Sequence, residues 1–359
     1  MAARNILDIL FLDSWILDRA RGSGSAVAIA GLAGGLRSLG HRVTILRPRF
    51  HLPTVDLTRI SANIDFRSRV RSFPADLIVG FDLDGCFLGT PRAPYVVALK
   101  GVMADELRYE TGWNRARFQL LSRLERRNAR RADRVIVTSA HSRRVAAEAY
   151  NLDPDRTGVV PEGIDVEGWS GLVPAPRRAD SPPTILSVAR QYRRKNTATL
   201  IRAMAIVRKS IPAAQLRVVG DGPEVPRLRA LVRSLKLEHA VDLVGSVDGA
   251  GGIRTEMARA DVFCLPSRQE GFGIVFLEAM AAGLPIVAAE CAAVPETAPP
   301  GEVSLLVEPD DVHALAAALV RLLRDGELRA RLADAGAARW RQFAWPGVAI
   351  RFLAEAGFG

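Results

Sequence analysis

The 359-residue sequence predicts an α/β protein made of two Rossmann-like, doubly wound domains. Apolar runs of strand length alternate with longer helical patterns, which is typical of parallel sheets covered by helices. The alternation stops once, in a glycine- and proline-rich segment between Gly163 and Pro183, and then restarts. We therefore predict an N-terminal domain over residues 1–163, a C-terminal domain over residues 164–340 and a linker at their junction.

Each half contains six predicted strands. In the first half they are residues 6–12, 42–46, 77–80, 95–99, 135–138 and 158–160, with helical patterns at 26–39 and 115–132. In the second half they are residues 184–188, 215–219, 241–244, 262–265, 285–287 and 304–307. Such sheets bind ligands beyond the carboxyl ends of their strands, so two domains facing across a cleft would place a site between them.

Composition favours a folded cytoplasmic protein, with 48% apolar and 25% charged residues. Cys86, Cys264 and Cys291 stand far apart, which fits a reducing compartment and provides neither a disulfide framework nor a metal-binding pair. The five histidines form no cluster with metal-ligand spacing. Asp8 and Asp13 interrupt the apolar start of the chain, so we expect neither a signal peptide nor a membrane helix there.

The net charge of +10 is carried mostly by arginine. We expect no nucleic-acid partner, because no binding motif is present and aromatic residues make up only 6%. The helical stretch between Arg115 and Arg134 is the densest basic segment. It also contains Arg123, Arg126, Arg127, Arg130 and Arg131. Scattered solvated charges are the simpler interpretation where a nucleic-acid partner is concerned. The basic helix face, in contrast, suits peripheral contact with anionic lipids at the inner face of a membrane.

The clearest chemical motif runs from Glu270 to Glu278, after the predicted strand 262–265. Gly271 and Gly273 allow a backbone to approach a ligand closely, and a helix is predicted to begin near Ile274. Unpaired N–H groups at a helix start bind anions. Glu278 would reach a ribose diol and Glu270 would reach sugar hydroxyls. The alternative is an ordinary helix start whose acidic residues favour the dipole.

Two further segments follow strands of the second half. Arg190 and Lys195 are predicted beyond the strand 184–188, where a diphosphate would lie, and both side chains suit phosphate oxygens. Two ordinary surface cations are the alternative. Gly220, Asp221 and Gly222 form a glycine turn after the strand 215–219, which is a common loop when taken alone.

In order and spacing, these segments together resemble the retaining glycosyltransferases of the GT-B fold, of the group 1 or family 4 type. The resemblance covers essentially the whole chain and is more specific in the second half. It implies transfer of a hexose-type sugar, with retention of configuration, from a nucleotide-diphosphate sugar to a carbohydrate, lipid or small-molecule acceptor. Of the UDP-, GDP- and ADP-sugars we expect a UDP-sugar, with no metal or other cofactor required.

The resemblance also implies roles for individual residues. The C-terminal domain would bind the donor, with Arg190 and Lys195 on the diphosphate, Glu270 on the transferred sugar and Glu278 on the ribose. The segment from Arg21 to Ser25 looks like the family's glycine loop. The other expected donor contacts are Gly24, Gly220, Asp221, Gly222, Gly271, Phe272, Gly273, Ile274 and Val275.

The N-terminal domain would hold the acceptor, and a last helix at about 341–359 would pack back on it. Family members often have His-Gly after the strand 95–99, whereas this chain has Lys100 and Gly101. We expect Lys100 to neutralise a phosphate or to bind an acidic acceptor. Asp82 and Asp84 resemble a metal motif of another glycosyltransferase fold. We expect them instead to line the acceptor side or to end a strand.

Three alternatives remain open from the sequence. A nucleotide-sugar epimerase or a sugar phosphorylase has the same two-domain fold. A binding protein that has lost transfer is compatible with Lys100 in place of histidine. A nicotinamide dehydrogenase is disfavoured, because the first glycine loop lacks the third glycine of the dinucleotide fingerprint.

Overall fold

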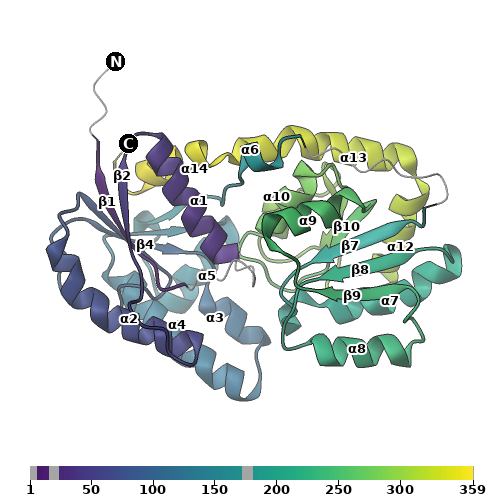
Figure 1. Ribbon diagram of the computed structural model, residues 1–359, viewed down its shortest axis with the longest axis horizontal. Coiled ribbons are helices and arrows are strands. Elements are labelled where there is room, and N and C mark those ends of the chain that lie inside the picture. Colours follow the sequence, from purple (N-terminus) through teal and green to yellow (C-terminus); the bar gives the residue numbers. More distant parts are fainter. Residues whose placement is uncertain (1–5, 16–23, 172–180, 359) are drawn as a thin grey trace. The chain divides into compact units, whose positions relative to one another are not determined.

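The computed structural model describes residues 6–15, 24–171 and 181–358, which form two compact units (Figure 1). Of the described residues, the first unit contains those up to Gly163 and again those from Phe343 onwards. The second unit contains Ile164 to Gln342. The chain therefore leaves the first unit once and returns to it near its end.

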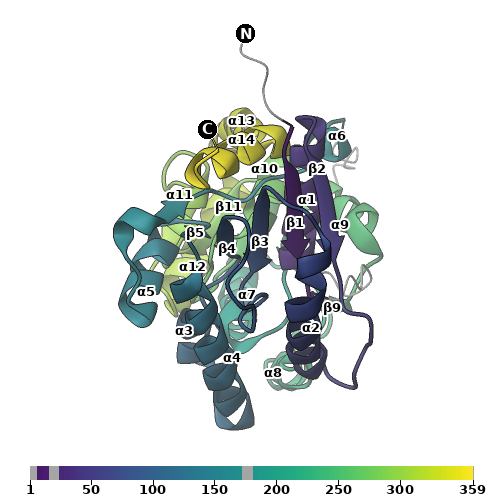
Figure 2. The same cartoon turned by 90° about the vertical axis from the view of Figure 1, so that its left-hand side faces the viewer.

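The first unit is built on a parallel six-stranded sheet of order β2-β1-β3-β4-β5-β6 (Figure 2). The strands are β1 (Asp8–Leu12), β2 (Arg42–Leu46), β3 (Leu77–Phe81), β4 (Tyr95–Leu99), β5 (Arg134–Val137) and β6 (Thr157–Val159). The helices are α1 (Gly24–Ser38), α2 (Val55–Arg69), α3 (Met103–Glu106), α4 (Gly112–Arg131), α5 (Ala140–Tyr150) and α14 (Trp345–Glu355).

The second unit repeats this design with the order β12-β11-β10-β7-β8-β9, again all parallel. Its strands are β7 (Thr184–Val188), β8 (Gln215–Val219), β9 (Val241–Gly245), β10 (Val262–Leu265), β11 (Ile286–Ala289) and β12 (Ser304–Val307). Its helices are α6 (Val166–Trp169), α7 (Thr197–Ser210), α8 (Val225–Ser234), α9 (Gly249–Ala258), α10 (Ile274–Ala281), α11 (Val294–Thr297), α12 (Val312–Arg324) and α13 (Gly326–Arg339). The order reverses between β7 and β10, which is where such sheets bind ligands.

Burial on both faces explains why the strands read as continuous apolar runs. Every residue of β3, β4, β7, β10 and β11 is buried. In the second unit α7 and α12 pack on the sheet, where Met204 and Leu319 are fully buried in one core. The polar residues that follow these strands are thereby held on rigid supports.

The predicted α/β architecture of two domains is confirmed. All twelve predicted strands are present, and their bounds differ from the predicted ones by no more than two residues. The segment predicted as a linker differs in one respect, because it contains the short helix α6. Asp165 caps that helix, with its Oδ1 accepting a hydrogen bond from the Gly168 N–H at 3.1 Å.

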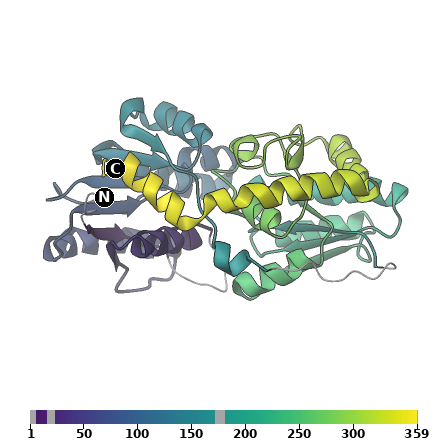
Figure 3. The same cartoon turned by 90° about the horizontal axis from the view of Figure 1, so that it is seen from above.

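The last helix, α14, packs against α1 of the first unit (Figures 1 and 3). Trp345 opens α14 and is 8% exposed. It lies so close to Gly31 and Gly35 of α1 that a Cβ on either glycine would overlap it. Small residues on α1 thus create the space in which the indole is buried.

This packing predicts a stability difference between two positions of the same helix. Trp345→Ala should lower the free energy of unfolding by about 3 kcal/mol or more, because it leaves a cavity against the two glycines. Ile350→Ala, at a position 44% exposed, should change it by less than about 1 kcal/mol. Urea denaturation followed by circular dichroism measures both, and equal effects would contradict the packing role of Trp345.

Candidate functional site

The start of α10 has the backbone geometry that its glycines predict. Gly273 precedes the helix with φ of +87°, in the left-handed region, and a Cβ there would lie 2.6 Å from the Phe276 ring. No side chain caps the helix, so its first N–H groups lack a side-chain acceptor. Ile274 and Val275 form the first turn, as predicted, and both are partly exposed. The helix start therefore offers donors and a positive dipole end to an anion.

Lys195 and Glu270 form an ion pair beside this helix start. Lys195 ends the short 3-10 turn η5 (Arg193–Lys195), which follows β7, and its Nζ lies 2.6 Å from Glu270 Oε1. Their side chains are 15% and 7% exposed. The Ser267 hydroxyl also donates to Glu270 Oε1, at 2.7 Å. The structure thus brings together two residues that the sequence analysis placed in separate motifs.

The charges around Glu270 keep its carboxylate ionised. Burial by itself would raise the pKa of Glu270, but Lys195, the Ser267 hydroxyl and Arg194 together hold it below its usual value. The sequence analysis missed the role of Ser267, although Ser267 stands three residues before Glu270 in the same loop. That close spacing in one loop was the sequence feature that could have indicated a contact between Ser267 and Glu270.

Arg190 and Glu278 lie on the two sides of the sheet reversal. Arg190 follows β7, and its guanidinium carbon lies 5.5 Å from the centre of the Tyr192 ring. The guanidinium carbon of Arg194 lies 5.4 Å from the centre of the same ring, so Tyr192 contacts two arginines of this loop. Glu278 lies partly buried in α10, and burial raises its pKa to about 7. A hydroxyl donor at this carboxyl would favour its ionised form.

The glycine turn after β8 packs against the loop that carries Arg190. A Cβ on Gly220 would overlap the Ala189 carbonyl oxygen, and one on Gly222 would lie 2.6 Å from the Gln191 carbonyl oxygen. The Gln191 N–H donates to the Asp221 carbonyl at 3.0 Å. Close backbone packing thus explains both glycines, and their contact with a donor stays a prediction.

Gln191 is a supporting residue that the sequence analysis missed. It is 1% exposed, and its Nε2 donates to the Ala189 carbonyl at 2.7 Å. The Thr197 hydroxyl at the start of α7 donates to Gln191 Oε1 at 2.7 Å. These bonds tie the loop after β7 to the next helix. The position of Gln191 within the basic motif does not indicate that its side chain makes these internal hydrogen bonds.

The remaining predicted donor residues have mixed surroundings. Gly24 is exposed at the start of α1, whereas Arg21 to Ser23 of the predicted glycine loop lie outside the described residues. Phe272 is buried, and its carbonyl accepts a hydrogen bond from the Thr297 hydroxyl at 2.7 Å. Gly271 is half-buried in the same loop.

Asp82 and Asp84 are the centre of a buried polar network in the first unit. Asp84 is fully buried and accepts hydrogen bonds from the Ser14 N–H and hydroxyl and from Asn63 Nδ2. Asp82 accepts from the Lys100 N–H at 2.8 Å and from Trp15 Nε1 at 2.9 Å. Burial raises the pKa of both carboxyls. They thus order the segment after β1, and contact with an acceptor stays a prediction.

Lys100 is paired with a carboxylate that the sequence analysis missed. Its Nζ lies 3.0 Å from Glu162 Oε1, and the two side chains are 8% and 6% exposed. Burial raises the pKa of Glu162, while Lys100 acts in the opposite direction. Glu162 stands 62 residues away in the chain, so no local pattern joins the two. The pairing reduces the positive charge that Lys100 offers to a phosphate or an acidic acceptor.

The described residues contain no group of three or more His, Cys, Asp or Glu side chains placed to hold a metal ion. Nor does any helix among them have the length and apolar character to cross a membrane.

The fold and the site define a two-domain glycosyltransferase of the GT-B type. The family model "glycosyl transferases group 1" matches residues 173–339, and the model "glycosyltransferase family 4" matches residues 22–167. The chain belongs to the group 1 glycosyltransferases. This membership favours sugar transfer over the epimerase, phosphorylase and dehydrogenase alternatives.

Relatives with known activities include mannosyltransferases. The chain is 30% identical over 337 residues to a GDP-mannose-dependent alpha-(1-6)-phosphatidylinositol monomannoside mannosyltransferase of Mycobacterium tuberculosis, covering 87% of this chain and 82% of the relative. It is 38% identical over 223 residues to a phosphatidyl-myo-inositol mannosyltransferase of Mycobacterium leprae, covering 61% and 57%. The UDP-sugar expected from the sequence is not supported, because the Mycobacterium tuberculosis relative is described as GDP-mannose-dependent.

Solved structures share the fold at low sequence identity. A sucrose-phosphate synthase from Thermosynechococcus elongatus superposes with a TM-score of 0.80 at 23% identity, covering 96% of this chain and 97% of that one. HepE from Anabaena, in complex with UDP and glucose, gives 0.77 at 21% identity, covering 98% and 99%. These likenesses establish the fold.

The raised pKa of Glu278 predicts a pH-dependent loss of stability in the ligand-free protein. Its carboxyl ionises near 4.5 when unfolded but near 7 when folded. Its contribution to stability is therefore fully present below pH 4.5 and is lost as the pH rises through 7. Relative to Glu278→Gln, the wild type should lose about 1–3 kcal/mol of unfolding free energy between pH 5 and pH 8.

Urea denaturation at the two pH values measures this difference. Glu302→Gln, at an exposed position of the same unit, is the matched control and should follow the wild type. The raised pKa would be contradicted if the difference in unfolding free energy between the wild type and Glu278→Gln is the same at both pH values.

Proposed function

We propose that this chain is a retaining mannosyltransferase that transfers mannose from GDP-mannose to a phosphatidylinositol-type glycolipid. The observation that carries the proposal is the buried pair of Lys195 and Glu270 at the uncapped start of α10. The choice of mannose, GDP and lipid is supported by the names of the relatives. The second unit would bind the donor and the first unit the acceptor.

The proposed chemistry breaks the bond between the anomeric carbon and the diphosphate. Negative charge then grows on the leaving GDP, and fixed positive groups stabilise it most in the transition state. Arg190, Lys195 and the first N–H groups of α10 would supply this stabilisation without a metal ion. Each charge-assisted hydrogen bond contributes roughly 1.5–3 kcal/mol.

The two glutamates would hold the rest of the donor. Glu270 stays ionised beside Lys195 and would accept hydrogen bonds from the hydroxyls of the transferred sugar. Glu278 has no recorded hydrogen bond or ion pair of its carboxyl among the described residues, and burial raises its pKa to about 7. Two ribose hydroxyls would supply the missing donors and favour the ionised form of Glu278.

A lipid acceptor would require the protein to work at a membrane surface, which we propose is the cytoplasmic face. The basic helix α4 supports this. Five arginines are exposed on it, namely Arg123, Arg126, Arg127, Arg130 and Arg131. Of these, Arg127 and Arg131 also donate to the backbone carbonyls of Cys86 and Leu88. The helix also exposes two large apolar side chains, Trp113 at 82% and Leu120 at 50%. Arginines beside apolar anchors suit anionic lipid headgroups.

The transfer assay tests the proposed donor chemistry directly. With GDP-mannose and a phosphatidylinositol acceptor, Lys195→Ala should lower kcat on the order of tenfold or more, because it removes a charge from the leaving diphosphate. Glu270→Gln should lower it as well. Lys209→Ala, an exposed cation of the same unit, should transfer normally.

The donor and the stereochemistry are read in the same assay. GDP-mannose should be used in preference to UDP- and ADP-sugars, and the product should keep the α configuration by NMR. Near-normal transfer by Lys195→Ala would remove this lysine from the mechanism. Preferred use of a UDP-sugar, an inverted product, or GDP-mannose binding without transfer would each overturn the corresponding part of the proposal.

Membrane contact is tested with vesicles. Replacing Arg123, Arg126 and Arg130 by glutamine should weaken binding to phosphatidylglycerol vesicles by at least about tenfold, since each arginine near an anionic surface contributes about 1 kcal/mol. The control replaces three exposed cations of the second unit, Lys209, Arg229 and Arg233. Equal losses in both triple variants, measured by co-sedimentation, would show that net charge rather than α4 is responsible.

A further inference from the structure

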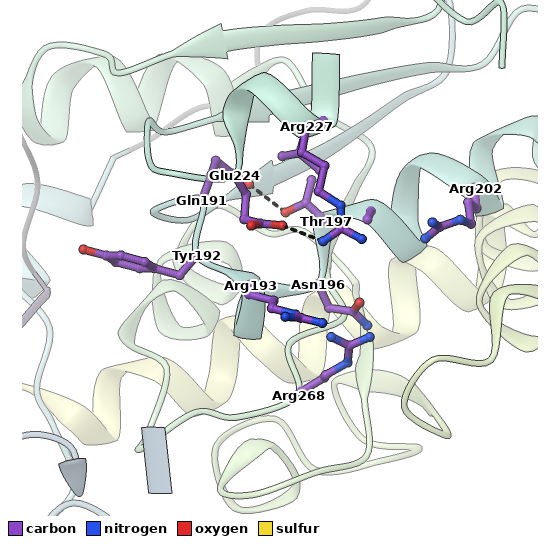
Figure 4. A pocket seen from close by; sticks show the side chains of 11 residues that line it. Gln191, Tyr192, Arg193, Asn196, Thr197, Arg202, Glu224, Arg227 and Arg268 are labelled. Atoms are coloured by element: carbon purple, nitrogen blue, oxygen red, sulfur yellow. Dashed lines mark hydrogen bonds and ion pairs between the residues drawn. The ribbon is translucent and has the colours of Figure 1, made fainter. Parts of the chain in front are cut away.

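Four arginines converge on a pocket of the second unit that the proposed donor chemistry does not use. The pocket lies between the starts of α7 and α8 (Figure 4). Arg193 comes from η5, Arg202 from α7, Arg227 from α8 and Arg268 from the loop after β10. Because the four side chains come from four separate elements, the fold rather than a run of basic sequence gathers this charge.

The carboxylates near the pocket compensate only part of its charge. Glu224 is the one acidic residue among the described residues that line it, and Arg227 Nη1 lies 3.2 Å from Glu224 Oε2. Arg268 pairs with Asp310 at 2.6 Å. No ion pair of Arg193 or Arg202 with a described carboxylate is recorded. The pocket therefore keeps an excess of positive charge.

The start of α7 adds to this positive potential. Asn196 precedes the helix in the left-handed conformation, and its side chain does not cap the backbone N–H groups. Its Oδ1 accepts instead from the Thr199 hydroxyl at 2.9 Å, and its Nδ2 donates to Asp310 Oδ1 at 3.0 Å. The first turn of this 14-residue helix lies in the pocket lining with Thr197. Figure 4 shows the side chains of Arg193 and Arg268 directed towards Asn196. Guanidinium groups beside a helix start are suited to phosphate oxygens.

We propose that this pocket binds a phosphate group at a site separate from the donor site. Arginine forks match phosphate oxygens in pairs, and an anion would be held by guanidinium groups from separate elements, chiefly Arg193 of η5 and Arg227 of α8. Neither Lys195 nor Glu270 lines the pocket, because the two side chains pair with each other at 2.6 Å. The phosphate belongs either to a free phosphorylated molecule or to a lipid headgroup.

Inorganic phosphate is the first probe, titrated into the full chain and followed by calorimetry. Arg193→Gln/Arg227→Gln should weaken phosphate binding by at least about tenfold, because it removes two charge-assisted contacts. Lys195→Gln should keep this binding site, so the result does not depend on the identity of the sugar donor. Arg229→Gln/Arg233→Gln removes the same charge from exposed positions of α8 that do not line the pocket, and should bind as the wild type does.

Three results would overturn the proposal. If Lys195→Gln abolishes phosphate binding while Arg193→Gln/Arg227→Gln retains it, the phosphate binds at the proposed donor site instead. Equal weakening in the Arg229→Gln/Arg233→Gln control would show an effect of net charge alone. An absence of saturation up to tens of millimolar phosphate would show that the pocket binds no phosphate.

Vesicles distinguish the two sources of the phosphate. A lipid headgroup is supported if phosphatidic acid vesicles capture the wild type, phosphatidylcholine vesicles do not, and Arg193→Gln/Arg227→Gln loses the capture. Saturable binding of inorganic phosphate without a vesicle difference between wild type and that variant would support a free phosphorylated molecule.

Discussion

The ion pair between Lys195 and Glu270 is the contact on which the candidate site of the second unit depends. It joins the loops that follow β7 and β10, the neighbouring strands between which the second sheet reverses its order. A buried ion pair loses much of its Coulomb energy to desolvation, so stability is a weak reason for having one. Its effect is to keep the Glu270 carboxylate ionised beside Lys195 at an uncapped helix start. A pair of apolar residues could pack there but would offer no charged group to a ligand.

Neighbouring residues restrict the loops that carry this ion pair. Gln191 links the loop after β7 to α7 and to the backbone of Ala189, while the glycines after β8 let a third loop pack directly against it. Ser267 orients Glu270 from within its own loop. Each of these contacts restricts a side chain or a loop that would otherwise lose conformational entropy on binding. The candidate site therefore depends on residues that need not touch a ligand.

The sequence predicted the sheets, and it placed the candidate site residues just after their strands, because both follow from local patterns. Buried parallel strands such as β7 read as short apolar runs, and the residues just after them must lie at the carboxyl edge. Ser267 and Gln191 escaped notice because a single serine or glutamine inside a motif has no distinctive spacing. Glu162 escaped because its partner Lys100 is 62 residues away and the contact exists only in the folded sheet.

Burial was the property that the sequence could not supply for Asp82 and Asp84. Their spacing resembles a metal motif, yet hydrogen bonds from Ser14, Asn63 and the Lys100 backbone use their oxygens internally. The base of the donor is a similar case, since contacts to a base leave little pattern in a sequence. There the relatives point to GDP, where the sequence analysis favoured UDP.

Burial affects the candidate carboxyl groups of the two units in different ways, and this bears on how each unit would recognise its substrate. In the second unit, the pKa of Glu270 is held low by its neighbours, whereas burial raises the pKa of Glu278 to about 7. In the first unit burial prevails: it raises the pKa of Asp13 to about 7 and those of Asp82 and Asp84 as well. Lys100 is buried there against Glu162, with its Nζ 3.0 Å from Glu162 Oε1. The polar groups at the edge of the first sheet are thus paired or close to neutral, and recognition by them would rest on hydrogen bonds to hydroxyls rather than on net charge.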